Sequence, residues 1–463
     1  MPRASRSSSH RRSARLPKEL RCVNLNAAGI DIGATRHHVA VPEGRDPDGQ
    51  DVREFGTCTA DLHTLAAWLT TCGIDTVAME STGVYWIPLF ELLSQRRVDV
   101  KLVDPRQLKH VPGRKTDVLD CQWLQRLHTF GLLAAAFRPD DAICVLRGYL
   151  RQRAMLVSYA ADHIQHMQKA LEQMNVKLPE VVTDITGVTG MAIIRAIGNG
   201  ERQPARLAAL RDGRCKQSEA TIARALEGTW RDEHLFALRQ AVELFDVYHA
   251  KITDCDRQIQ ACLETFEDKS DGTPLPTEPR TSKRPRNTPA FDVRGHLHRL
   301  TGVDLTQLDG IDAHAALKVI AEIGLDMRRW PTEKHFASWL ALSPGNKISG
   351  GKVLNSRTKV SANRAAAVLR LAASSLHHSH SALGAFFRRL KGRLGAPKAI
   401  TATARKLACL IYNMLKHGTQ YVDQGQEYYE RRYQGRVLAN LTRRARELGY
   451  HLVKTPESPA ASV

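Results

Sequence analysis

The first part of the chain, from residue 24 to about 139, alternates short apolar runs with amphipathic stretches. Short strands bounded by turn residues are expected at 29–33, 38–41, 52–58, 76–80 and 100–103. Helical patterns are expected at 62–69, 85–95 and 115–129. Three strands in direct succession, followed by helices and strands in alternation, predict a mixed sheet with helices on its faces.

A different pattern follows the α/β region. Apolar residues recur at alternating steps of three and four from residue 150 to 178 and again from 235 to 266. This spacing is typical of the seam between long paired helices, and the pairing can occur within one chain or between chains. A stretch rich in Pro, Thr, Lys and Arg at 270–290 then indicates a domain boundary, and a compact, largely helical region follows it.

These patterns predict an α/β domain followed by all-α regions, the second of them basic. The expected divisions are a disordered basic arm at 1–21, the mixed-sheet domain at 22–140, a long-helix, coiled-coil-like scaffold at 141–268, a linker at 269–292, a mainly helical C-terminal domain at 293–452 and a tail at 453–463.

Positive charge is concentrated at the two ends of the chain. Lys and Arg number 67 against 48 Asp and Glu, which gives a formal net charge of +19. Residues 1–21 contribute +6 and residues 343–463 contribute +16, so the stretch between them is close to neutral. Two basic ends are typical of a protein that binds a polyanion, most often a nucleic acid.

Composition also excludes several classes of protein. No run of about 18 apolar residues is present, so we expect no membrane-spanning segment. The N-terminus is rich in Arg and Ser and lacks the apolar core of a secretory signal. The nine cysteines are scattered and never form a Cys-x-x-Cys pair, which indicates reduced thiols. We therefore expect a cytoplasmic protein that binds nucleic acid and no membrane.

Four carboxylates are the candidate catalytic and metal-binding residues of the first domain. Asp31 lies in the first expected strand, and Glu80 ends the fourth. Asp117 and Asp120 are three residues apart on the closing helix and therefore share one helix face. Carboxylates gathered at low dielectric need a cation, and their hard oxygens favour Mg²⁺ or Mn²⁺. Two such ions can hold the attacking and leaving oxygens of a phosphodiester displacement.

The glycines beside Asp31 are expected to serve the same chemistry. Gly29 and Gly33 would leave room for a phosphate backbone next to the Asp31 carboxylate. The Asp-Ile-Gly sequence at 31–33 also opens actin-like sugar kinases and chaperones. Those folds need a second glycine-rich phosphate loop, and the later Asp-Gly pairs are not set between strands, so this alternative is disfavoured.

Three segments of the first domain, at 29–33, 78–83 and 114–120, resemble the Asp–Glu–Asp–Asp pattern of the DEDD insertion-sequence transposases. The resemblance implies an RNase H-like domain similar to the RuvC Holliday-junction resolvase, with the four carboxylates holding the metal. It also implies donor and target DNA as substrates, a guide (bridge) RNA made from the end of the element, and a homo-oligomer, either a dimer or a tetramer.

A serine precedes two glycines at 349–351 in the C-terminal domain, on what is expected to be an exposed, permissive loop. Cations that could bind phosphates and stabilise transition-state charge crowd the same segment, at Lys347, Lys352, Arg357, Lys359 and Arg364. The family resemblance implies that Ser349 is the nucleophile, linked covalently to DNA in a composite site with the carboxylates. Ser343 is the weaker candidate for this role.

Two further parts of the C-terminal domain are expected to contact nucleic acid. Residues 305–312 resemble a helix-hairpin-helix, whose turn would receive a DNA phosphate, and a purely structural hairpin is the alternative. A basic helical face that includes Arg388 and Arg389 is expected to bind duplex or RNA phosphates. The tyrosines at 428, 429 and 433 are expected to pack in the core rather than stack on bases.

The sequence thus favours a transposase or site-specific recombinase of a bacterial insertion sequence, which cuts and exchanges DNA strands with metal-bound carboxylates and a serine. Two alternatives stay open. The first is a RuvC-like nuclease or junction resolvase in which the carboxylates do all the chemistry and Ser349 is structural. The second is a nucleic-acid-binding protein that keeps the fold without catalysis.

Overall fold

The computed structural model describes residues 21–81, 83–105, 117–277, 287–361 and 363–453. The chain divides into two compact units, Met1–Arg138 and Pro139–Val463, which are described separately below. None of the helices in these described ranges combines the length and the apolar character that a membrane crossing requires. The finer division of the second unit into scaffold, linker and C-terminal domain stays a prediction.

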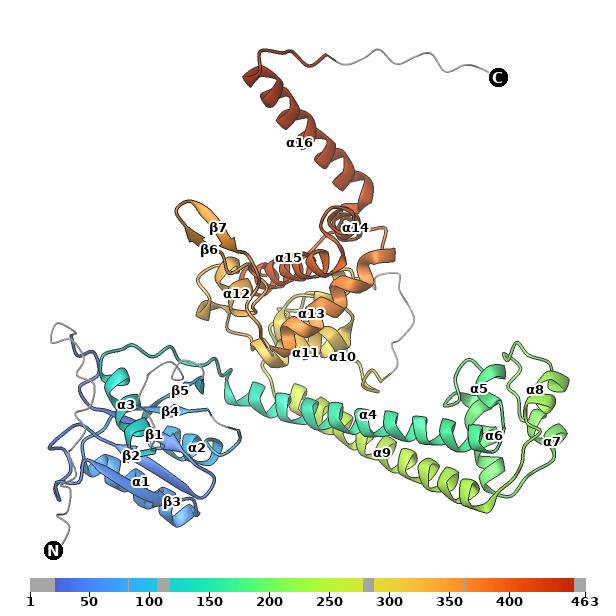
Figure 1. The fold of residues 1–463 in the computed structure, drawn as a ribbon, viewed down its shortest axis with the longest axis horizontal. Helices are drawn as coiled ribbons and strands as arrows, with labels where there is room; N and C mark the ends of the chain where they lie inside the picture. Colours follow the sequence, from blue (N-terminus) through green and yellow to red (C-terminus); the bar gives the residue numbers. More distant parts are fainter. Residues whose placement is uncertain (1–20, 82, 106–116, 278–286, 362, 454–463) are drawn as a thin grey trace, which may run out of the picture. The chain divides into compact units, whose positions relative to one another are not determined.

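A mixed five-stranded sheet forms the centre of the first unit (Figure 1). Its strands are β1 (Ala27–Ile32), β2 (Arg36–Ala40), β3 (Val52–Gly56), β4 (Thr76–Glu80) and β5 (Asp99–Val103), in the spatial order β3-β2-β1-β4-β5. The three consecutive strands pair antiparallel, whereas β1, β4 and β5 pair parallel. All five expected strands are present with boundaries within two residues of the prediction, and the expected mixed sheet is confirmed.

Helices cover both faces of this sheet. On one face, α1 (Thr59–Thr71) and α2 (Ile87–Gln95) pack on the apolar side chains of the parallel strands, such as Ile30 and Met79. On the other face, α3 (Asp117–Thr129) packs on β1, β2 and β4. The sheet is therefore covered on both faces where β1 and β4 meet. Apolar side chains are expected at such a position, so a carboxylate there indicates a functional role.

The second unit begins with two long antiparallel helices, α4 (Asp141–Gln173) and α9 (Asp232–Glu264), which pack against each other within one chain (Figure 1). The sequence leaves pairing within or between chains open, and the structure shows pairing within the chain. The chain connects the far ends of these helices through four short helices, α5 (Leu178–Val181), α6 (Val188–Gly198), α7 (Pro204–Ala208) and α8 (Glu219–Ala225).

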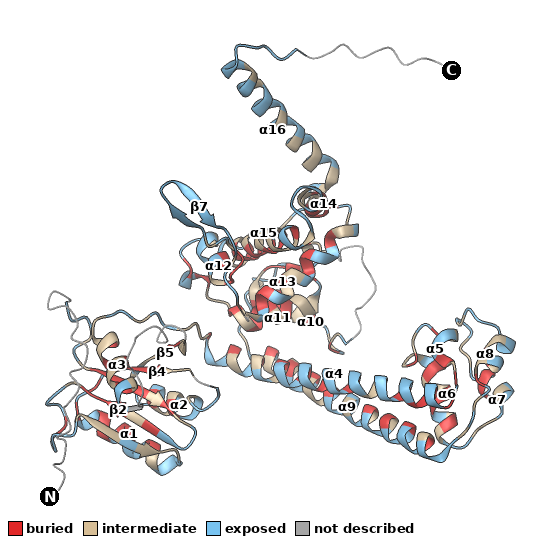
Figure 2. Ribbon diagram, in the orientation of Figure 1, coloured by how far each residue is buried: buried red, intermediate tan, exposed pale blue. Residues whose placement is uncertain are grey.

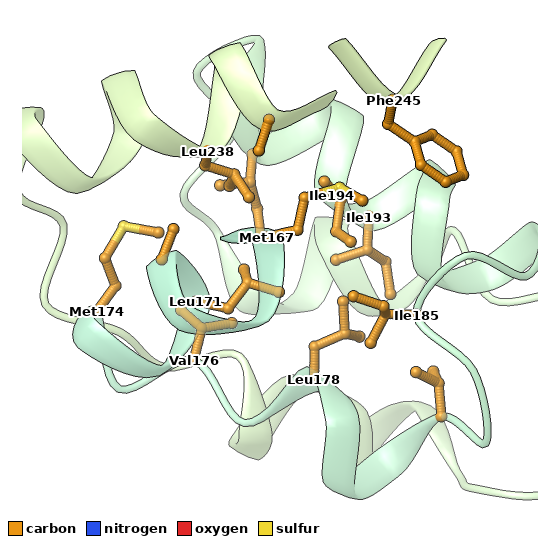
Figure 3. Packing of buried hydrophobic residues seen from close by; sticks show 14 of the residues in the cluster. Met167, Leu171, Met174, Val176, Leu178, Ile185, Ile193, Ile194, Leu238 and Phe245 are labelled. Atoms are coloured by element: carbon orange, nitrogen blue, oxygen red, sulfur yellow. The ribbon is translucent and has the colours of Figure 1, made fainter. Parts of the chain in front are cut away.

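The short helices close the far end of the helical hairpin around an apolar core. Met167 and Leu171 of α4, Ile193 and Ile194 of α6 and Leu238 of α9 point into this core (Figure 3). All five side chains are fully buried, and full burial of one such side chain contributes about 1.5–3 kcal/mol. This end of the hairpin is therefore held by its own hydrophobic cluster.

The rest of the second unit is mainly helical and is interrupted by one exposed β-hairpin. Its elements are α10 (Val293–Thr301), η2 (Leu305–Gln307), α11 (Ala313–Ile323), η3 (Met327–Arg329), α12 (Glu333–Trp339), β6 (Lys347–Ser349), β7 (Lys352–Asn355), α13 (Arg364–Ser375), η4 (Leu376–His378), α14 (Ala382–Leu394), α15 (Ala396–His417) and α16 (Gly425–Glu447). Figure 2 shows a buried stripe along α15, whereas α16 has no buried residue.

Polar contacts join these helices to the open end of the α4–α9 hairpin. Arg147 of α4 donates hydrogen bonds to the carbonyl oxygens of Ala321 (2.9 Å) and Glu322 (3.0 Å) at the end of α11. Arg153 of α4 forms a buried ion pair with Asp256 of α9, with Nε 2.5 Å from Oδ1. Asp256 also accepts a hydrogen bond from the backbone N–H of Ala290, so the pair ties both long helices to the chain that enters α10.

We expect the buried Arg153–Asp256 ion pair to be a main determinant of the stability of this junction. Both side chains are less than a tenth exposed, so Arg153→Ala leaves the Asp256 charge buried and lowers the free energy of unfolding by about 3–5 kcal/mol. Arg151 forms a more exposed pair with Glu322, and Arg151→Ala is the matched control, at about 1 kcal/mol or less. Urea denaturation measures both variants, and equal effects would contradict this account.

Candidate active site

Asp31 and Glu80 lie side by side on neighbouring parallel strands. The register places Ile30 of β1 opposite Met79 of β4, and one residue further along both strands are Asp31 and Glu80. Residues in register on parallel strands point to the same face, so the two carboxylates share one face of the sheet. Both residues are half-buried at the carboxyl ends of their strands, where α/β sheets usually place their functional groups.

The face that carries these carboxylates is the one that α3 covers. Gly29 shares it with Asp31, because alternate residues of a strand point the same way. A Cβ atom on Gly29 would lie 2.3 Å from the carbonyl oxygen of Cys121 and 2.3 Å from the backbone nitrogen of Gln125, both in α3. The backbone of α3 therefore rests directly on Gly29.

The direction of α3 places its acidic N-terminal end at the carboxyl ends of the strands. His128, near the C-terminal end of α3, has Nε2 2.8 Å from the hydroxyl of Thr76, the first residue of β4. The helix thus runs opposite to β4, so its backbone begins, at Asp117, at the end of the sheet where Asp31 and Glu80 lie. The fold brings the predicted acidic positions to one end of one sheet face.

The prediction that Gly29 and Gly33 leave room for a phosphate backbone is wrong. The space beside Gly29 is filled by α3. A Cβ atom on Gly33 would lie 2.4 Å from the carbonyl oxygen of Arg36, in the turn between β1 and β2. Both glycines therefore serve the packing of the chain on itself, and this requirement arises from contacts that a local pattern does not reveal.

We expect Gly29→Ala to be one of the more destabilising single-methyl substitutions in the chain. The added methyl group meets backbone atoms of α3, which cannot rotate away, so a loss of about 1–3 kcal/mol or more is expected. In the described part of the chain, a Cβ atom on Gly148 in α4 would have no neighbour within 4 Å beyond the backbone of its own helix. Gly148→Ala is the control, expected to be neutral or slightly stabilising. Thermal unfolding of the two variants compares them directly.

The pKa of the Cys121 thiol is affected by the carboxylates of this site. Burial raises its pKa to about 12, and the nearby negative charges of Asp31 and Asp120 add to the shift. One carboxylate comes from β1 and the other from α3, so both act on the same buried point. Asp31 and Asp120 are therefore both close enough to the buried Cys121 thiol to influence its pKa.

The donor chemistry of this region fits a hard divalent cation. Asp31, Glu80 and Asp120 offer only carboxylate oxygens, the ligands that Mg²⁺ and Mn²⁺ prefer. Within the described residues, no three metal-ligating side chains gather into one group. Asp117 begins α3, but its side chain lies outside the described part of the chain, as do residues 114–116 of the predicted motif. The complete four-carboxylate set therefore stays a prediction.

Ser349 lies at the tip of the exposed β-hairpin formed by β6 and β7. Gly350 and Gly351 form its two-residue turn with φ values of 54° and 74°. This left-handed conformation at both positions is the one that tight hairpin turns need and that glycine adopts most readily. Among the described residues, and apart from the adjacent ones in the chain, no atom lies within 4 Å of a Cβ position on either glycine. The turn thus presents the Ser349 hydroxyl on an open surface that a phosphate backbone can approach.

Several cations lie on the same hairpin and in the chain that follows it. Lys352 is the cross-strand partner of Ser349, so the two side chains leave the same face of the hairpin. The other predicted cations of this segment are also exposed, at Lys347, Arg357, Lys359 and Arg364. Ser343 is only partly exposed, whereas Ser349 is exposed, which agrees with Ser343 being the weaker candidate for the nucleophile. Phosphate binding by these side chains stays a prediction.

The structure gives Arg388 and Arg389 internal contacts. Arg388 donates hydrogen bonds to the carbonyl oxygens of His377 (3.2 Å) and Ser379 (2.5 Å) and to the side chain of Gln426 (2.7 Å). The guanidinium of Arg389 lies 3.0 Å from the ring centre of Tyr433 in α16. Both arginines thus join α14 to neighbouring segments, and their predicted binding to phosphates is untested.

The helix-hairpin-helix-like segment packs against the protein itself. A Cβ atom on Gly310 would lie 2.6 Å from the carbonyl oxygen of Ala372 in α13, so the turn is held against that helix. Asp312, which stands where a glycine is usual, caps α11 by accepting a hydrogen bond from the N–H of Ala315 at 2.7 Å. These contacts favour the structural hairpin over a phosphate-binding turn.

A mixed sheet covered by helices, with carboxylates at the ends of two adjacent central strands, is the RNase H-like architecture of enzymes that cut nucleic-acid backbones or transfer their strands. Two family models match the chain. Residues 28–176 match a DEDD-type transposase model, and residues 304–388 match the model described as Transposase IS116/IS110/IS902 family. The chain belongs to the DEDD transposases of the IS110 family.

Membership of this family makes the protein a DNA-cutting and strand-transferring enzyme of an insertion sequence. DEDD transposases generally use divalent metal ions, in agreement with the oxygen donors found here. The two matched segments together cover about half of the chain and leave α9, α15 and α16 outside. Among curated proteins, none matches the sequence. The alternative interpretation of Asp-Ile-Gly as a kinase motif is not supported.

Proposed function

We propose that this transposase exchanges DNA strands through a serine–DNA intermediate, with Asp31, Glu80, Asp117 and Asp120 as metal ligands and Ser349 as the nucleophile. The main observation in support of the metal site is the register between β1 and β4, in which Asp31 and Glu80 are neighbours on the sheet face that α3 covers. The observation that supports the nucleophile is the exposed two-glycine turn that presents Ser349 next to Lys352.

The proposed step is a substitution at phosphorus. The Ser349 oxygen forms a bond to the scissile phosphate and gives its proton to a base, because an unassisted hydroxyl is a poor nucleophile. The bond from phosphorus to one deoxyribose oxygen breaks, and that oxygen takes up a proton. A deoxyribose hydroxyl of the second DNA strand then loses its proton and attacks the phosphorus of the serine–DNA linkage. The bond from phosphorus to the Ser349 oxygen breaks and that oxygen takes up a proton, so the number of phosphodiesters is unchanged.

Charge stabilisation comes from two groups of residues. Lys352, the cross-strand partner of Ser349, and Arg357, exposed in the chain after the hairpin, would offset the negative charge that grows on the phosphate oxygens as the serine attacks. Mg²⁺ or Mn²⁺ held by the four carboxylates would supply Lewis-acid stabilisation to the same oxygens. The proposal requires that the carboxylates and Ser349 act on the same phosphodiester.

The partners proposed for this reaction are donor and target DNA, a guide RNA transcribed from the end of the element, and further copies of the chain in a dimer or tetramer. The reaction would take place in the bacterial cytoplasm, at the nucleoid. The strong excess of positive charge from residue 343 onward supports binding to nucleic acid.

A reconstituted reaction tests the proposed components by omission. Purified protein is mixed with donor DNA, target DNA, the element-end RNA and Mg²⁺, and recombinant junctions are quantified by PCR. We expect junctions only when all four are present. Junctions without the RNA would contradict guidance, and junctions in excess EDTA would contradict the metal site. Cutting without junctions under every condition would favour the nuclease or resolvase alternative, and the absence of any cutting would favour the non-catalytic one.

A further inference from the structure

A groove of about 750 Å³ lies between α14, α15 and α16, near the C-terminal end of the chain. We refer to it below as the α14–α16 groove. It is separate from the exposed hairpin that carries Ser349, and α16 lies outside both segments that match family models. Its volume is within the range of natural ligand-binding sites.

The lining of the α14–α16 groove is strongly cationic. Five basic side chains contribute to it, at Arg389, Arg393, Lys406, Arg432 and Arg436, and its described lining contains no Asp or Glu. In the described part of the chain, none of these five cations forms an ion pair with a carboxylate. Cations held close together without counter-charges repel one another, so the groove is complementary to an anion.

Aromatic rings form one wall of the same groove. Tyr429 and Tyr433 are one turn apart on α16 and face α14. Phe386 of α14 meets the Tyr429 ring edge-on, with the ring centres 6.2 Å apart. The Arg389 guanidinium lies over both tyrosines, 3.0 Å from the ring centre of Tyr433 and 5.7 Å from that of Tyr429.

In the part of the chain that the structure describes, the guanidinium of Arg389 also has an unsatisfied hydrogen-bond donor. Its Nη1 atom is buried and has no hydrogen-bond partner within the described residues. A planar guanidinium held against tyrosine rings offers a stacking surface as well as charge. Partial burial raises the pKa of the Tyr429 hydroxyl, which stays neutral and adds no negative charge beside the arginines.

We infer that the α14–α16 groove binds an unpaired segment of RNA or DNA. Its bases stack on Tyr429 and Tyr433, and its phosphates contact Arg393, Arg432 and Arg436. The bases of a duplex are stacked on one another and show only their edges, whereas an unpaired base can bring its flat face to a tyrosine ring. An anion without bases would use the cations but not the rings. This inference goes beyond the proposed recombination site and does not depend on its catalytic residues.

Binding by the full-length protein tests the inference. Fluorescence anisotropy measures the affinity for an oligouridine RNA and an oligothymidine DNA, each about 12 nucleotides long, and for a duplex of that length. We expect the double variant Tyr429→Leu/Tyr433→Leu to bind the better single strand at least about tenfold more weakly, with less than about twofold change for the duplex. Tyr450→Leu is the matched control, since Tyr450 is 72% exposed and lies outside the groove.

A spectroscopic signal separates stacking from a merely structural role of the tyrosines. A single 2-aminopurine in the oligonucleotide should lose fluorescence on binding to the wild-type protein, because a base stacked on an aromatic ring is quenched. Tyr433→Phe should keep the quenching, since the ring remains. Quenching that is absent in the wild-type protein, or equal losses of single-strand and duplex affinity in the double variant, would overturn the inference. The tighter of the two probes shows whether the groove prefers RNA or DNA.

The cations make a further measurable contribution. Each phosphate contact removed from a single strand should lower the slope of log K against log salt by about 0.7. Arg432→Gln/Arg436→Gln should therefore lower the single-strand slope by about 1.4. Arg444 is on the same helix but outside the groove, so Arg444→Gln should leave this slope unchanged. An unchanged slope in the double variant would contradict phosphate binding in the α14–α16 groove.

Discussion

Replacing any one of Asp31, Glu80, Asp117 or Asp120 by its amide is expected to lower strand exchange by at least about 10³-fold. Each substitution removes one negative charge from the proposed metal-binding set while keeping the size of the side chain. Binding to DNA and RNA should be retained, because those contacts come from cations elsewhere in the chain. Recombinant junctions measured by PCR, and nucleic-acid affinity measured in parallel, give the two readouts.

Two controls accompany the carboxylate variants. Glu91→Gln changes an exposed carboxylate on α2 and should leave strand exchange unchanged. Excess EDTA should abolish exchange by the wild-type protein, and added Mg²⁺ should restore it. Full exchange by the Asp31→Asn or Glu80→Gln variant would contradict the assignment of the metal site to the strand ends of the sheet.

Ser349→Ala is expected to have an effect at least as large. Loss of the hydroxyl removes the nucleophile, so strand exchange should fall below detection, by about 10⁴-fold or more, while DNA and RNA binding stay within about twofold of wild type. Ser343→Ala is the matched control, because Ser343 precedes the same hairpin and should be dispensable. A Ser349→Ala variant that still exchanges strands would favour the alternative in which the carboxylates do all the chemistry.

Much of the fold can be predicted because its signals are local. Each strand of the sheet is a short apolar run bounded by turn residues, and α4 and α9 carry apolar residues at steps of three and four. The pairing of α4 with α9 cannot be decided in the same way, since a helical seam looks the same whether its partner is in the same chain or in another.

Contacts between distant segments explain what the sequence does not predict. The tight packing of α3 on Gly29 joins residues more than 90 positions apart, so the local pattern around the glycine favours space for a ligand instead. The buried Arg153–Asp256 pair, which ties the stretch before α10 to the long helices, is equally nonlocal. Neither feature leaves a periodic signal.

Some residues of the candidate site can be predicted from the sequence because they belong to local patterns. Asp31 and Glu80 end two strands whose adjacency follows from the strand pattern, and Ser349 precedes two glycines whose turn is local. The α14–α16 groove is not predicted, and the tyrosines are expected in the core, although α16 has no buried residue. A signal is present in the four-residue spacing of Tyr429 with Tyr433 and of Arg432 with Arg436, which places each pair on one helix face.

The central claim is that Ser349 becomes linked to DNA during strand exchange, and trapping that intermediate tests it most directly. A reaction with labelled DNA is stopped with denaturant, digested with a protease and a nuclease, and the peptide that retains a nucleotide is sequenced by mass spectrometry. The account predicts a single modified peptide with the nucleotide on Ser349. A nucleotide on Ser343 or on a tyrosine, or cleavage of DNA without any linked peptide, would contradict it.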